Sequence, residues 1–210
     1  MTLLTDNDIV LKLAAFDLLS ETCAWLGIAP HEVQALATAK YRLRDPRLAD
    51  TYGKEGLDRA VAFVGQTSVI GTPSDTKELD ALTGAKALGY DIDAGEAALF
   101  AATSLQPPDF LLTTGDKRCL VNIARFPDAP RVRQRLARRV LCLEQVLLAL
   151  IGQHGFAFVQ ARVWDARACD GSVRLAFGYS QPTGEADARA GLESFVRDLD
   201  AQTNGLLAAI

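Results

Sequence analysis

The sequence LLTDNDIV (residues 3–10) lies close to the start of the chain and sets the pattern for the fold. Its apolar residues lead into Asp6-Asn7-Asp8, and a periodic apolar run follows that turn. This run consists of Ile9, Leu11, Leu13, Ala14, Phe16, Leu18 and Leu19. A short apolar segment, an acidic turn and then helical periodicity predict a strand, a turn and a helix.

The same order of elements recurs later in the chain. The sequence DAGEAAL (93–99) predicts an alanine-rich helix led by acidic residues, which Pro107-Pro108 must end. The sequence FLLTTGD (110–116) then predicts a buried strand that ends at Gly115-Asp116. Apolar residues between Leu120 and Ala124 predict a further helix.

Strands and helices therefore alternate over residues 1–126, which predicts an α/β fold with a parallel sheet flanked by helices. Ligands of such folds bind beyond the carboxyl ends of the strands. Asp6 and Asp116 directly follow predicted strands, and Glu96 begins a helix that can point into the same cleft.

The segment between these two motifs is expected to be helical. Pro30 suits the first turn of a helix that continues through Leu36 and Ala37. Residues 40–65 mix charged and apolar positions, as helices with one solvated face do. Ser74 or Asp75 is the expected cap of a helix through Glu78 and Leu82.

The character of the sequence changes at Pro127, so we expect one α/β domain over residues 1–126 and an α+β extension of unknown role over 127–210. This extension is expected to hold a long helix from Val132 to Gly152 and a β-hairpin. The hairpin strands would be residues 156–164 and 173–179 around the turn Asp170-Gly171, followed by a final helix from Glu185.

The composition is that of an ordinary globular protein, with 49% hydrophobic and 23% charged residues. The net charge of −4 means that nucleic-acid binding would need a local basic patch or metal ions. The scattered cysteines and two histidines do not predict a zinc site. Val140–Gly152 is too short to span a bilayer, and no signal peptide is evident, so we expect a cytoplasmic protein with no membrane partner.

Carboxylates from distant points of a chain are what phosphodiester hydrolysis with Mg²⁺ or Mn²⁺ requires. The segments 3–10, 93–99 and 111–117 resemble, in order and spacing, those of the PIN-domain ribonuclease family, which includes toxins of VapC type. In that family an opening strand ends in Asp, and an acid-led helix precedes a strand that ends in Thr-Gly-Asp-Lys. The resemblance covers residues 1–125.

The resemblance implies roles for individual residues. Asp6, Glu96 and Asp116 would take the family's first, third and fourth acidic positions and hold the metal, with Asp8 as a helper and Thr114 orienting a water. Glu32 is the candidate for the second acid, and Glu78 is its rival. RNA, single-stranded or structured, is the implied substrate, and an antitoxin or other protein partner and a homodimer are implied by the same likeness.

Other interpretations stay open. Each acid can serve only as a helix cap or turn residue. Asp6-Asn7-Asp8 also fits the opening motif of haloacid dehalogenase-like phosphatases, with Asp6 as nucleophile and Asp8 as acid/base. That family would need a late Asp where Leu120 stands, and Lys86 matches its lysine only loosely. A non-catalytic module that binds a protein through residues 127–210 is a third possibility.

Two basic groups have the side chains to bind phosphates. The first is Arg131, Arg133, Arg135, Arg138 and Arg139, and the second is Lys40, Arg42, Arg44 and Arg47. For both groups we favour the simpler interpretation of a solvated helix face.

Overall fold

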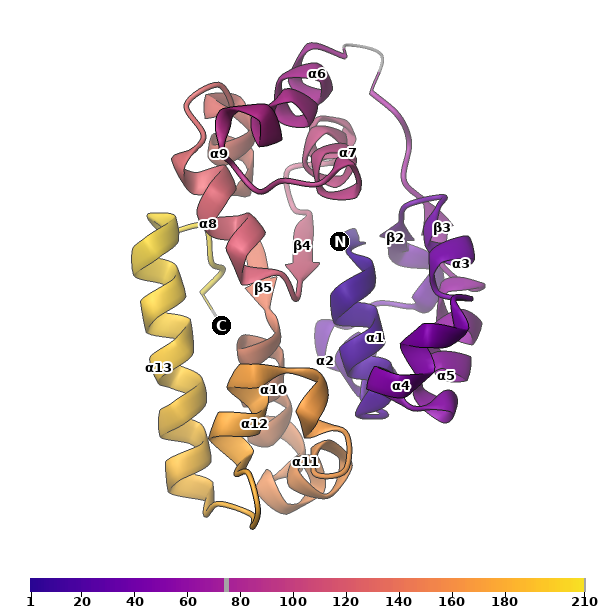
Figure 1. Cartoon of the computed structure of the whole chain (residues 1–210), viewed down its shortest axis with the longest axis vertical. Helices are drawn as coiled ribbons and strands as arrows, with labels where there is room; N and C mark the ends of the chain where they lie inside the picture. The colour runs from indigo at the N-terminus through magenta and orange to yellow at the C-terminus, as the bar shows by residue number, and fades with distance from the viewer. Residues whose placement is uncertain (74–75, 210) are drawn as a thin grey trace.

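The computed structural model describes residues 1–73 and 76–209, and it contains a five-stranded, all-parallel sheet flanked by helices (Figure 1). The strand order is β3-β2-β1-β4-β5, with every neighbouring pair parallel. The strands are β1 (Leu3–Thr5), β2 (Val33–Ala35), β3 (Ser68–Val69), β4 (Leu111–Thr114) and β5 (Val140–Cys142). The predicted α/β class with a parallel sheet is therefore confirmed.

Helices make up most of the remaining chain. The α-helices are α1 (Asn7–Ala15), α2 (Leu19–Leu26), α3 (Ala39–Arg42), α4 (Ala49–Tyr52), α5 (Lys54–Val64), α6 (Lys77–Gly84), α7 (Ala94–Ala102), α8 (Lys117–Arg125), α9 (Pro130–Leu136), α10 (Leu143–His154), α11 (Phe156–Val163), α12 (Gly171–Phe177) and α13 (Glu185–Thr203). Short 3-10 helices are η1 (Pro30–Glu32), η2 (Pro46–Leu48), η3 (Ala85–Leu88), η4 (Thr103–Leu105) and η5 (Arg167–Cys169). The expected cap of α6 at Ser74 or Asp75 lies outside the described residues.

Both faces of the sheet are covered, which explains why its central strands are apolar on both sides. On one face, Leu4 and Leu112 pack into a core formed with α7, α8 and α9. On the other face, Leu141 packs with residues of α1 and α10. The helices pack apolar residues against both faces of the sheet, so the sheet and these helices shield one another from solvent.

Two strands, β2 and β5, replace predicted helical segments. The helix expected after Pro30 is wrong, because the chain makes only the single turn η1 before β2 pairs with β1. The helix expected from Val132 to Gly152 is also wrong, because it is interrupted by β5 between α9 and α10. Arg138 has a positive φ of 58°, which ends α9, and the fully buried residues of β5 then pair with β4. Pairing within the sheet thus overrides local helical propensity.

The β-hairpin predicted around Asp170-Gly171 is wrong, because its two strands are the helices α11 and α12. Val159 and Val163 are four residues apart and both are fully buried, which is helical rather than alternating spacing. Asp170 does not form a hairpin turn but caps α12, accepting hydrogen bonds from the N–H groups of Ser172 and Val173. The final helix from Glu185 is confirmed as α13.

The residues after Pro127 share a core with those before it. They supply β5, and Leu207 forms a parallel bridge with Val140 beside it. Figure 1 shows α13 running along one side of the molecule beside α8, α10 and α12, and these helices are in contact. Among the helices of the described residues, none combines the length and apolar character needed to cross a bilayer.

The packing of α5 on α1 yields a first prediction. A Cβ atom added to Gly56 would lie 2.9 Å from the backbone Cα of Ala15, closer than real contacts allow. Gly56→Val should lower the free energy of unfolding by about 2 kcal/mol in urea denaturation, because overpacking forces the two helices apart. Gly84→Val is the control, since a Cβ there meets no atom within 4 Å. Equal midpoints for the two variants would contradict this packing.

Candidate active site

A cavity of about 600 Å³ lies beyond the carboxyl ends of β1 and β4. Six carboxylates line it, and four of them were candidates from the sequence: Asp6 follows β1, Asp8 lies on α1, Glu96 lies on α7 and Asp116 follows β4. The three predicted metal ligands Asp6, Glu96 and Asp116 are therefore brought into one cavity from distant parts of the chain. Asp45 and Asp93 also line the cavity, and the sequence analysis did not single them out.

Asp6 connects the ends of the two central strands. Its Oδ1 atom caps α1 by accepting a hydrogen bond from the Ile9 N–H at 2.8 Å. Its Oδ2 atom accepts from the Gly115 N–H at 3.2 Å and from the Thr114 hydroxyl. The carboxylate is thus held in one orientation by groups from both strand ends.

Asp116 and Glu96 are also tied to helix starts. Asp116 caps α8, with its Oδ1 atom accepting from the Cys119 N–H at 3.0 Å. Glu96 forms a capping box with Asp93, and its Oε2 atom accepts from the Asp93 N–H at 2.7 Å. The capping roles considered from the sequence are therefore real, and they coexist with a shared position in the cavity.

The cavity disfavours negative charge. Burial raises the pKa of the Asp6 carboxyl to about 7, and the negative charge of Asp8 adds to this rise. Burial also raises the pKa of Glu96. The Cys119 thiol has a raised pKa because it is buried and because Glu96, Asp116 and Asp6 all lie near it. These carboxylates therefore share a region of incompletely compensated charge.

Lys12 supplies the only positive charge that the described residues bury beside these acids. Its Nζ atom forms ion pairs with Asp8 at 2.6 Å and with Asp170 at 2.9 Å, and it donates to the Gly115 carbonyl at 3.3 Å. Burial lowers the pKa of Lys12, but Asp8 and Asp170 more than offset this and leave the pKa above its usual range. Sequence reasoning missed Lys12, although a lone lysine four residues after Asp8 within an apolar run was an available signal.

Asp170 belongs to a buried polar network that continues away from the cavity. Ser172 donates from its hydroxyl to Asp170 at 2.5 Å, and Lys117 lies 2.5 Å from Glu144 and 2.6 Å from the Ser172 hydroxyl. Glu144 is fully buried. The network joins α1, α8, α10 and α12, so residues on both sides of Pro127 fix the side chains around the cavity.

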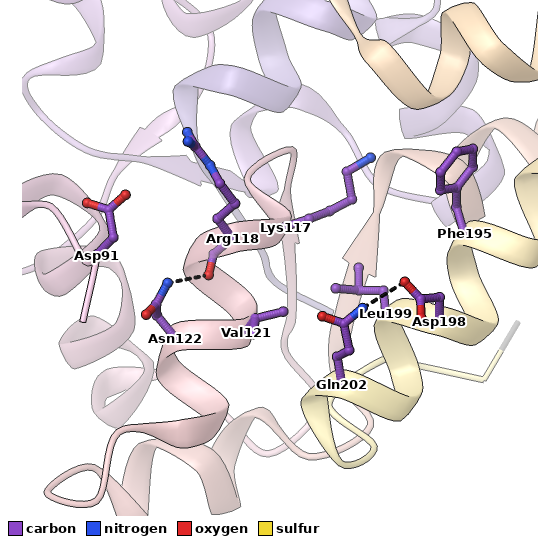
Figure 2. A pocket seen from close by; sticks show the side chains of 9 residues that line it. All are labelled: Asp91, Lys117, Arg118, Val121, Asn122, Phe195, Asp198, Leu199 and Gln202. Atoms are coloured by element: carbon purple, nitrogen blue, oxygen red, sulfur yellow. Dashed lines mark hydrogen bonds between the residues drawn. The ribbon is translucent and has the colours of Figure 1, made fainter. Parts of the chain in front are cut away.

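Lys117 also borders a second cavity of about 400 Å³ between α8 and α13. Figure 2 shows its side chain pointing toward Phe195 of α13, whose ring centroid lies 5.5 Å from the ammonium. The wall of this cavity mixes cations with Asp91 and Asp198 and with apolar Val121 and Leu199. Lys117 thus points away from the acidic cavity, although it directly follows Asp116.

Neither candidate for the second acid lines the acidic cavity. Glu32 accepts a hydrogen bond from the Ala29 N–H at 2.8 Å through its Oε2 atom and closes η1. Glu78 forms a bidentate ion pair with Arg135. The arginine-rich segment is therefore partly structural, since Arg135 is paired with Glu78 and Arg138 lies 3.5 Å from Asp200.

The carboxylates of the cavity have the donor chemistry that a hard divalent cation needs. Carboxylate oxygens are the ligands that Mg²⁺ and Mn²⁺ prefer, and the raised pKa of Asp6 indicates negative charge that a cation would stabilise. Within residues 1–73 and 76–209, however, no three His, Cys, Asp or Glu side chains form a ready-made metal site. The chemistry of the donors fits such an ion, and each of the three carboxylates also accepts a hydrogen bond at the start of a helix.

No protein-family model, curated protein or solved structure matches the chain. The functional assignment therefore depends on the cavity itself.

The buried Lys12–Asp170 pair gives a second prediction. Burial alone would raise the pKa of Asp170, but Lys12, Lys117 and the Ser172 hydroxyl hold it well below its usual range. A carboxylate with a depressed pKa stabilises the fold above its unfolded pKa of about 4, and this contribution is lost as the pH falls toward the folded pKa. Asp170→Asn should therefore lower the free energy of unfolding by about 2 kcal/mol at pH 7.

The difference between wild type and Asp170→Asn should shrink in urea titrations as the pH falls below about 4. Asp58→Asn is the control, because Asp58 forms an exposed ion pair with Lys54 and its loss should leave the midpoint nearly unchanged. A difference that stays constant from neutral to acid pH would show that the Asp170 charge does not stabilise the fold.

Proposed function

We propose that this chain is a metal-dependent endoribonuclease of PIN type, in which Asp6, Glu96 and Asp116 hold Mg²⁺ or Mn²⁺. The observation that carries the proposal is the single cavity into which these three acids extend. They come from the ends of β1 and β4 and the start of α7, where ligands of parallel α/β folds bind. They follow one another along the chain in the order of the first, third and fourth acidic positions of the PIN family.

The side chains around the cavity have different roles in the proposed reaction. A bound divalent cation would activate a water and offset charge on the scissile phosphate and the leaving oxygen. Thr114 and Gly115 fix the orientation of Asp6 through hydrogen bonds to its Oδ2 atom. Lys12 holds Asp8 at 2.6 Å and limits the repulsion between Asp8 and the other acids. Asp8 is thus a positioning residue.

The phosphatase alternative is less well supported by the same contacts. A nucleophilic carboxylate needs an oxygen that can reach phosphorus, yet both oxygens of Asp6 accept hydrogen bonds. Asp8, the acid/base of that mechanism, is paired with Lys12.

The non-catalytic alternative has a specific observation in its favour. Asp6 and Asp116 cap helices, Glu96 completes the capping box of α7, and the described residues contain no ready-made metal site. A protein-binding module would need these acids only as caps, so metal-dependent activity is the property that separates the two functions.

The rest of the proposal follows the resemblance. RNA is the substrate, and an antitoxin or other protein partner and a homodimer are the associations that the family implies. We also place the protein in the cytoplasm, where its four free cysteines would stay reduced.

Cleavage of labelled RNA tests the proposal. With Mn²⁺, wild type should cut a single-stranded RNA, and EDTA should abolish the cut. Asp6→Asn and Asp116→Asn should each lose at least about 100-fold in rate, because each removes charge that helps to hold the cation. Glu32→Gln is the matched control and should cut at the wild-type rate, since Glu32 does not line the cavity.

Circular dichroism and calorimetric titration of Mn²⁺ complete the experiment. The Asp6 and Asp116 variants should remain folded but bind Mn²⁺ more weakly than wild type and Glu32→Gln. Cleavage that survives EDTA, or that Glu32→Gln reduces as much as Asp6→Asn does, argues against this site. Absence of both cleavage and Mn²⁺ binding in wild type favours the non-catalytic module.

A further inference from the structure

The short helix α3 brings an exposed aromatic ring to the acidic cavity. Tyr41 lines the cavity, yet 66% of its surface is exposed. The Lys40 ammonium lies 5.1 Å from the centroid of its ring. A single exposed aromatic residue is common on protein surfaces and needs no explanation by itself. Its position beside a cavity and among cations is what makes it informative.

The cations around Tyr41 are available to a ligand. Arg42 lines the same cavity and is exposed, and Arg44 is exposed two residues further along the chain, just after α3 and outside the cavity lining. Among the described residues, neither guanidinium has an ion-pair partner, whereas Arg47 is paired with Asp45 at 2.6 Å. Elsewhere Arg135 and Arg189 are paired with Glu78 and Glu185. Unpaired arginines beside a cavity are suited to phosphate groups.

The short helix α3, which carries Tyr41, is anchored to the protein core. Ala39 and Leu43, which flank the exposed residues of α3, are fully buried in the core cluster shared with α1 and α5. The N–H groups of Tyr41 and Arg42 both donate to the Thr38 carbonyl, at 3.1 Å and 3.0 Å. The backbone of α3 is therefore anchored, and little ordering would be needed on binding.

We infer that α3 is a subsite for single-stranded nucleic acid, in which an unpaired base stacks on Tyr41 while Arg42 and Arg44 contact the neighbouring phosphates. This inference rests on the proposed function, because the subsite would hold a strand beside the acids that cut it. The acidic cavity repels phosphate, so a strand needs local cations next to it. In a duplex the base faces are already stacked, so an aromatic platform of this kind selects single strands.

Binding measurements without cleavage test the subsite. Fluorescence anisotropy of a short fluorescein-labelled single-stranded RNA, in EDTA and at low salt, gives the affinity of the full chain. Tyr41→Ala should weaken binding about 10-fold, and Tyr41→Phe should stay within about 2-fold of wild type, because stacking needs the ring and not the hydroxyl. Arg42→Gln should reduce the slope of log affinity against log salt by about 0.7.

Tyr179→Ala is the matched control. Tyr179 is also an exposed tyrosine, at 52%, with the Arg174 guanidinium 4.2 Å from its ring centroid, but it does not line the cavity. This variant should bind like wild type, and an unlabelled duplex of the same sequence should compete poorly. No binding by wild type, equal binding by Tyr41→Ala, equal losses in Tyr41→Ala and Tyr179→Ala, or equal competition by duplex would each overturn the inference.

The two proposals fail separately. If the Tyr41→Ala variant binds and cuts RNA like wild type while Asp6→Asn abolishes cleavage, the nuclease proposal stands and the subsite proposal does not. If wild type binds single strands through Tyr41 but shows no metal-dependent cleavage, the subsite stands and the nuclease does not.

Discussion

The parallel pairing of β1 with β4 is the constraint on which the candidate site depends. Thr5 lies opposite Thr113, and the Asp6 N–H donates to the Thr113 carbonyl at 3.3 Å. Because both strands end at the same edge of the sheet, the residues that follow them, Asp6 and Asp116, must meet there. A shift of register by one residue would turn Asp6 from the cavity toward the core.

Bringing acids together has an electrostatic cost, which the fold offsets only in part. Lys12 forms ion pairs with both Asp8 and Asp170, and the hydrogen-bond network through Ser172 connects Asp170 to Glu144 and Lys117. No comparable cation pairs with Asp6 among the described residues, and burial raises its pKa accordingly. The C-terminal part of the chain therefore contributes to the site, because Asp170 forms the ion pair that keeps Lys12 charged and in place.

Sequence patterns predicted the parts of the fold whose signals are local. The strand–acid–helix units at Asp6 and Asp116 follow from an apolar segment, a capping residue and helical periodicity. β2, β3 and β5 were missed because strands of two or three residues are defined by their partners rather than by their own periodicity. The hairpin error has the opposite cause, since Val and Phe at positions 156–177 favour strands but are buried at helical spacing. The spacing of Lys12 from Asp8 offered a local signal for one of its ion pairs, but its second partner, Asp170, is far away in the sequence and could not be read from it.

Helix capping and cation binding are compatible uses of the same carboxylates. A carboxylate has about four acceptor positions, and the cap of Asp116 occupies one oxygen, as does the capping bond of Glu96. The caps fix where each acid stands, while burial raises the pKa of Asp6 and Glu96 despite the hydrogen bonds that they accept. Arg42 of α3 lines the same cavity, and among the described residues it forms no ion pair with these acids. The cavity thus separates negative charge near the strand ends from positive charge on α3, an arrangement that suits a cation and a polyanion bound side by side.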